Sequence, residues 1–129
     1  RAHFDSHLFT LILPIKIPVA DKGGSVGDLI YFPNARNRPK NEVSNFLGKI
    51  YHKKYASKEG VDDFSLKHKK LTDDFKDYSP LLFMGNTTLH TNKSVSIDCS
   101  SNRLTLLAHF FDPSPKYGVG KLVRLLRAR

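Results

Sequence analysis

Glycine and proline divide this chain into short apolar runs, and this division limits the folds open to it more than any other feature. Such runs lie at residues 7–17, 29–32, 81–84 and 103–111, and residues 87–98 hold a weaker one. In the last strong run polar and apolar positions alternate, so Arg103, Thr105, Leu107 and His109 share one face of an extended backbone. Several short strands separated by turn residues predict a mainly β sandwich or barrel.

Residues 34–79 have a different composition, with eleven Lys and Arg against seven Asp and Glu. Within 41–55 the apolar residues recur at the spacing of one helical face, which predicts an amphipathic helix that Asn41 caps. The residues of that face are Val43, Phe46, Leu47 and Ile50. We interpret 34–79 as a helical and loop insertion between strands, and we predict a basic C-terminal helix at 117–128.

With 129 residues, the chain is expected to form a single domain over 1–129. No apolar run reaches the roughly 18 residues of a membrane span, and the N-terminus lacks the order of a secretory signal. Because the chain starts without Met, we expect a trimmed fragment or a mature piece of a longer protein. A single cysteine, Cys99, is compatible with a reducing compartment, and we expect a cytoplasmic protein.

The net charge of +9 indicates an acidic partner, such as nucleic acid, a membrane surface or an anionic metabolite. Four aromatic residues near lysines offer stacking platforms for bases, which makes a basic binding module for nucleic acid or anionic lipid an alternative function. They are Phe46, Tyr51, Tyr55 and Phe64. The helical periodicity assigns some of the same residues to a packed face, so charge alone does not choose between these functions.

The N-terminus carries a His-x-Asp pair, His3 and Asp5. Two positions apart on an extended backbone, these side chains point to one side with Cα atoms about 7 Å apart, so both reach one ion. A third ligand from a distant strand would complete a facial set of two histidines and one carboxylate, which leaves three metal positions open. His7 is the nearest rival of His3, because it lies at the same spacing on the other side of Asp5.

Further elements follow in a fixed order. They are the run at 9–13, Gly23-Gly24 ahead of residues 29–33, Gly85 ahead of Leu89-His90, and Arg103-Leu104-Thr105. In this order the chain resembles the Fe(II)/2-oxoglutarate-dependent oxygenases, closest to their phytanoyl-CoA dioxygenase-like or prolyl-hydroxylase-like members. The resemblance covers about half of the chain and concentrates at its two ends.

The resemblance implies a double-stranded β-helix, a jelly-roll or cupin-like fold, that lacks N-terminal elements which another segment or chain supplies. It implies that His3, Asp5 and His90 hold Fe(II). It further implies that Arg103 pairs with the distal carboxylate of 2-oxoglutarate and that Thr105 is a hydrogen-bonding neighbour. A guanidinium suits this task because it binds a carboxylate through two parallel hydrogen bonds.

The implied reaction consumes O2 and 2-oxoglutarate, releases succinate and CO2, and hydroxylates or desaturates a substrate that the sequence does not identify; the basic residues allow an anionic one. A scaffold of this family that has lost catalysis is a third hypothesis. Other interpretations of the residues stay open. His3 is then an exposed terminal residue, His90 and His109 are strand histidines, and Arg103 bonds to loop carbonyls or to Asp98.

Overall fold

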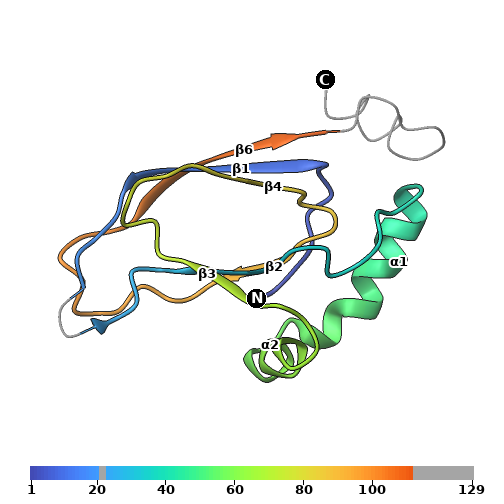
Figure 1. The fold of residues 1–129 in the computed structure, drawn as a ribbon, viewed down its shortest axis with the longest axis horizontal. Coiled ribbons are helices and arrows are strands. Elements are labelled where there is room, and N and C mark those ends of the chain that lie inside the picture. The colour runs from blue at the N-terminus through green and yellow to red at the C-terminus, as the bar shows by residue number, and fades with distance from the viewer. Residues whose placement is uncertain (21–22, 112–129) are drawn as a thin grey trace.

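Two antiparallel sheets of three strands each form the two layers of the fold in Figure 1. The computed structural model describes residues 1–20 and 23–111. The first sheet has the order β4-β1-β6, and its strands are Leu81–Phe83, Phe9–Lys16 and Leu104–Phe110. The prediction of a mainly β fold is confirmed, since the described part of the chain adds only short helices to these layers.

The second sheet has the order β3-β2-β5, with strands Leu71–Asp73, Leu29–Phe32 and Leu89–Asn92. In its register Tyr31 lies opposite His90. In the first sheet Thr10 lies opposite both Phe83 and His109. Directly opposed residues share a face, so each of these rows lies on one side of its sheet.

One cluster of buried side chains joins the two sheets. Its members are Ile12, Ile17, Val26, Leu29, Phe75 and Phe83. Because Ile12 and Phe83 belong to the first sheet and Leu29 to the second, the faces that carry them are turned toward each other. The inner faces therefore also carry Thr10 and His109 in the first sheet and His90 in the second.

The outer face of the second sheet has a separate core, which helix α2 covers (Figure 1). This helix spans Lys58–Ser65 and is capped by the hydroxyl of Ser57. Its Val61 and Phe64 pack with Ile30, Phe32 and Leu89 of the strands. These strand residues alternate with Leu29 and Tyr31, so the second sheet is buried on both faces.

Helix α1, Glu42–His52, confirms the helix predicted within 41–55. Asn41 caps it through a capping box with Ser44, as predicted for Asn41. The apolar face of this helix stays exposed, with 61% of Val43, 63% of Phe46, 58% of Leu47 and 54% of Ile50 accessible. A short 3-10 turn, Lys53–Tyr55, links α1 to α2, and α2 covers the sheet in place of α1.

The predicted insertion at 34–79 contains both helices and also β3, which pairs with β2. The last part of this stretch therefore belongs to the second sheet. The basic helix predicted at 117–128 lies outside the described residues. Among the helices of residues 1–20 and 23–111, none has the length and apolar character needed to cross a bilayer.

Candidate metal centre

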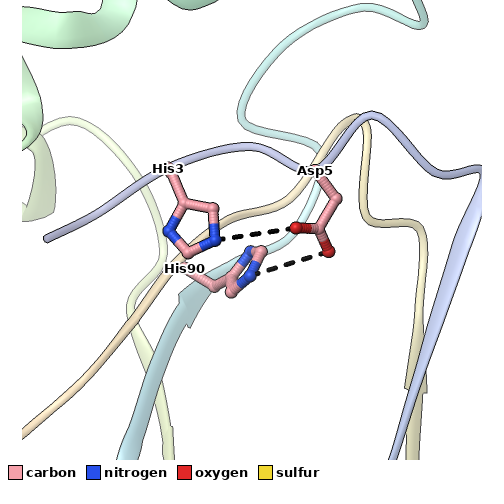
Figure 2. Close-up of side chains that lie close together, drawn as sticks. All are labelled: His3, Asp5 and His90. Carbon is pink, nitrogen blue, oxygen red and sulfur yellow. Dashed lines mark ion pairs between the residues drawn. The ribbon is translucent and has the colours of Figure 1, made fainter. Parts of the chain in front are cut away.

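His3, Asp5 and His90 meet at one point, as Figure 2 shows, and backbone hydrogen bonds hold all three there. The amide of His3 donates to the carbonyl of His90 and the amide of His90 donates to the carbonyl of His3, each at 3.0 Å. The amide of Asp5 donates to the Gly85 carbonyl at 2.9 Å. The N-terminal segment is thus docked beside β5, which brings the first residues of the chain to its distant histidine.

The facing side-chain atoms of the three residues leave room for an ion. His3 Nε2 lies 3.6 Å from Asp5 Oδ1, and His90 Nε2 lies 3.7 Å from Asp5 Oδ2. One nitrogen or oxygen atom from each residue lies within 4.8 Å of the others. Ligands bound at about 2.0–2.2 Å to a shared ion are separated by about 3 to 4 Å, so these spacings suit a common metal.

The second ring nitrogen of each histidine, Nδ1, fixes the tautomer that can bind a metal ion through Nε2. His3 Nδ1 lies 3.0 Å from the Arg1 carbonyl oxygen, and His90 Nδ1 lies 3.1 Å from the Thr88 carbonyl oxygen. A carbonyl only accepts hydrogen bonds, so each Nδ1 carries the hydrogen and each Nε2 keeps its lone pair. Both lone pairs are then available on the side where Asp5 lies (Figure 2).

Burial and charge at this site favour a bound cation. Asp5 and His90 are each 8% exposed, whereas the His3 side chain is 59% exposed, so the site opens to solvent beside His3. Burial lowers the pKa of His90, although the nearby Asp5 carboxylate raises it. Within residues 1–20 and 23–111, the ion-pair contacts of Asp5 are with His3 and His90 alone. A metal ion at this point would give the buried carboxylate of Asp5 the charged partner that buried ionic groups normally have.

Thr10 and Gly85 complete the support of Asp5. The Thr10 hydroxyl donates to Asp5 Oδ2 at 2.5 Å. A Cβ at position 85 would lie 2.7 Å from Thr10 Oγ1 and 2.8 Å from Asp5 Oδ2, so only glycine leaves room for the carboxylate there. The alternation of β1 places Thr10 on the inner face, but the sequence predicted no contact between Thr10 and Asp5 and assigned Gly85 only to a turn.

Replacing Thr10 by valine is expected to weaken metal binding about 10- to 100-fold, as is typical when a partner that orients a metal ligand is lost. The substitution removes the hydroxyl that donates to Asp5 Oδ2 and keeps the shape of the strand residue. Titration with Fe(II) or Zn2+ measures the effect. Thr72→Val, at an exposed position of β3, is the matched control, and equal affinities in the two variants would contradict this role of Thr10.

Replacing Gly85 by alanine is expected to weaken metal binding and to lower the free energy of unfolding by about 1–3 kcal/mol, a typical cost of overpacking. The added methyl group meets Thr10 Oγ1 and Asp5 Oδ2 and must displace them. Gly48→Ala in α1 is the control, because its Cβ would meet the guanidinium of Arg36 and no atom of Asp5 or Thr10, and because alanine favours a helix. Chemical denaturation and metal titration measure the two effects. A Gly85→Ala protein with the unfolding free energy and the metal affinity of the wild type would contradict the prediction.

Arg103 lies just before β6 and contacts both the loop before β2 and a member of the inter-sheet core. Its Nη1 donates to the carbonyl of Gly27, and its guanidinium lies 5.0 Å from the centre of the Phe75 ring. Burial lowers the pKa of Arg103, while Asp28 and Asp73 raise it. Its Nε is buried and has no hydrogen-bond partner within the described part of the chain.

The structure brings the three predicted ligands together but does not place Arg103 against them. Gly27, to which Arg103 bonds, precedes Tyr31 by four residues, and Tyr31 lies opposite His90. This separation corresponds to about 13 Å along an extended strand. The bond to Gly27 agrees with the alternative in which Arg103 bonds to a loop carbonyl. Thr105 lies opposite Pro14 in the register of the first sheet.

The aromatic residues proposed as stacking platforms divide into two groups. Phe64 is 3% exposed and Tyr55 packs against the same core, so these two rings serve the fold. Phe46 and Tyr51 are exposed on α1. Lys54 Nζ lies 4.7 Å from the centre of the Tyr51 ring and 5.0 Å from that of Tyr55. A stacking surface on α1 is therefore smaller than the sequence predicted.

Comparison with known proteins does not assign the chain to a family. No protein-family model, no curated protein and no solved structure matches it.

Proposed function

We propose that the chain is a non-haem Fe(II)- and 2-oxoglutarate-dependent oxygenase that hydroxylates or desaturates its substrate. The observation that carries this proposal is the convergence of two histidine Nε2 atoms and one buried carboxylate, each with a partner that orients it. Two imidazoles and a carboxylate form the facial set of non-haem Fe(II) oxygenases, in which three metal positions remain for other ligands.

The order of the strands supports a double-stranded β-helix as the fold of this proposal. Along the chain β1 lies in the first sheet, β2 and β3 in the second, β4 in the first, β5 in the second and β6 in the first. All strand pairs in both sheets are antiparallel. Repeated crossing between two packed antiparallel sheets is typical of jelly rolls. The bridge between His3 and His90 continues the second sheet on the far side of β5.

The residues of the chain have separate tasks in this proposal. His3, Asp5 and His90 would hold Fe(II), which when bound supplies the activation of O2 during oxidation of 2-oxoglutarate. Thr10 orients the Asp5 carboxylate, and the carbonyls of Arg1 and Thr88 orient the imidazoles. Burial of Asp5 and His90 keeps water away from two of the three ligands, and the open side at His3 gives access.

Arg103 would bind the distal carboxylate of 2-oxoglutarate. Its buried Nε lacks an acceptor within the described residues, and a carboxylate can accept from Nε and a neighbouring guanidinium nitrogen together. The sheet face on which Arg103 lies also carries His109, which is opposite Thr10 beside Asp5. A five-carbon dicarboxylate and an arginine side chain turned toward His90 would together span the separation between Gly27 and the metal centre.

Anaerobic titration with Fe(II) and 2-oxoglutarate tests the proposal, because the two bound together give a visible charge-transfer band. The wild type is expected to show the band and, with O2, to form succinate. His90→Ala is expected to show neither, whereas His68→Gln, which changes a histidine in the turn after α2, should behave as the wild type. A folded wild-type protein without the band would overturn the assignment.

A basic binding module for nucleic acid or anionic lipid is the second candidate, favoured by the exposed rings of Phe46 and Tyr51 on α1 and by Lys54 Nζ, which lies 4.7 Å from the centre of the Tyr51 ring. Binding through such a surface would weaken with salt, since it releases counterions. It would also survive Asp5→Ala, because Asp5 lies in the metal centre and not on α1. Electrophoretic mobility shifts and vesicle sedimentation at two salt concentrations separate this function from the oxygenase.

A further inference from the structure

A second group of potential metal ligands adjoins the first and shares one member with it. Asp5, His7 and His109 each offer one nitrogen or oxygen atom, and these three atoms lie within 4.8 Å of one another. His7 comes from the segment that leads into β1, and His109 comes from β6. The proposed oxygenase uses Asp5 but neither His7 nor His109, so these two histidines have no task in that reaction.

Pairing of β1 with β6 brings the histidines of the second group to one end of the first sheet. β6 pairs with β1 so that His109 lies opposite Thr10, and the Leu8 amide donates to the Phe110 carbonyl at 2.8 Å. His7 and His109 therefore meet at the same end of the first sheet. Their rings stack with centroids 4.1 Å apart and an angle of 20° between the ring planes.

Asp5 lies between the two pairs of histidines. Its carboxylate contacts His3 through Oδ1 and His90 through Oδ2, and Thr10 connects it to the other pair. The hydroxyl of Thr10 donates to Asp5 Oδ2 and lies 3.4 Å from His109 Nδ1. A carboxylate has about four lone-pair positions on its two oxygens, enough to bind two cations at once.

We propose that Asp5, His7 and His109 form a second site for a divalent transition metal, with the Asp5 carboxylate bridging this site and the first. Two imidazoles and a single carboxylate suit Zn2+, Ni2+ or Cu2+ better than Ca2+ or Mg2+, which prefer oxygen ligands. His109 is exposed, so the metal would keep solvent ligands and exchange readily. The proposal shares Asp5 with the oxygenase but does not depend on Fe(II), 2-oxoglutarate or catalysis.

Equilibrium dialysis against Zn2+, with bound metal counted by mass spectrometry, tests the proposal on the full chain. The wild type is expected to bind two equivalents. The double variant His7→Ala/His109→Ala should bind one, and so should His3→Ala/His90→Ala, each through its intact pair. His52→Gln/His68→Gln, which changes two histidines outside both groups, is the control and should bind two.

Three outcomes would overturn the second site. If the wild type binds one equivalent, the chain has a single site. If both double variants bind none, the two pairs of histidines belong to one site. A His7→Ala/His109→Ala variant that still binds two equivalents at wild-type affinity shows that these histidines are not ligands. The expected loss of affinity for the second equivalent is at least about 10- to 100-fold, since even changes to residues that merely orient a ligand cost that much.

Imidazole NMR gives a readout that does not depend on counting metal. The second equivalent of Zn2+ is expected to shift the ring nitrogen signals of His7 and His109 and to leave that of His68 in place. Circular dichroism shows whether each variant folds, so that a misfolded variant is not taken for a lost site. If the 2-oxoglutarate band is absent while the second equivalent still shifts His7 and His109, the oxygenase fails and the second site stands.

Discussion

Replacing Asp5 by alanine is expected to remove the increase in thermal stability that the proposed binding of Fe(II) would give to the wild type. Asp5 is the only carboxylate in the group with His3 and His90, and it is buried with both oxygens turned to the imidazoles. A metal at one hundred times its dissociation constant stabilises a folded chain by about 2.7 kcal/mol, a shift in Tm on the order of 10 °C for a domain of this size.

The shift in Tm should fall to nearly zero in Asp5→Ala. Losing a ligand lowers metal affinity by more than the roughly 100-fold that the loss of a supporting contact can cause. Scanning calorimetry with and without Fe(II), under anaerobic conditions, measures it. Asp62→Ala, at an exposed position of α2, is the matched control and should keep the whole shift. An Asp5→Ala protein that keeps it as well would show that the metal, if any, binds elsewhere.

Much of this site could be predicted from the sequence because extended backbone has a simple period. Residues two apart point the same way, which placed His3 with Asp5 and Arg103 with His109 on shared faces. The distant partner His90 came only from the order of motifs along the chain. Its contact with His3 is a bridge between segments 87 residues apart, and no local pattern specifies such pairing.

Contacts that depend on the packing of several elements could not be predicted. The spacing of Val43 and Phe46 shows that α1 has an apolar face, but periodicity does not say which helix covers the sheet. Gly85 looked like a turn residue, and its closeness to Asp5 became visible only once β4 was placed beside β1. In each case the backbone conformation depends on neighbouring residues, whereas the residues it contacts are distant in sequence.

The position of Arg103 could be predicted from the sequence only in part. Its inward face follows from the alternation of β6, yet its bond to the Gly27 carbonyl depends on the loop before β2. The guanidinium uses one nitrogen for this carbonyl, and its buried Nε has no acceptor among the described residues. An unsatisfied buried donor costs about 1–3 kcal/mol, which an arriving carboxylate would relieve.

Replacing Arg103 by alanine is therefore expected to weaken the binding of 2-oxoglutarate by about 2–5 kcal/mol, the usual effect of removing one partner of a buried charged pair. Fe(II) affinity should stay at the wild-type level, because Arg103 is bonded at Gly27 and not at the metal centre. Calorimetric titration of the Fe(II)-loaded protein with 2-oxoglutarate measures the loss, and Arg103→Lys should recover only part of it since an ammonium lacks the two-pronged geometry.

A second ligand separates carboxylate recognition from a general loss of structure. 2-Oxobutyrate keeps the keto-acid end that a metal binds and lacks the distal carboxylate, so its affinity should be the same in the wild type and in Arg103→Ala. The preference of the wild type for 2-oxoglutarate over 2-oxobutyrate should disappear in the variant. If Arg103→Ala weakened both ligands equally, the arginine would act through its contacts with Gly27 and Phe75, and the co-substrate would be held by other residues.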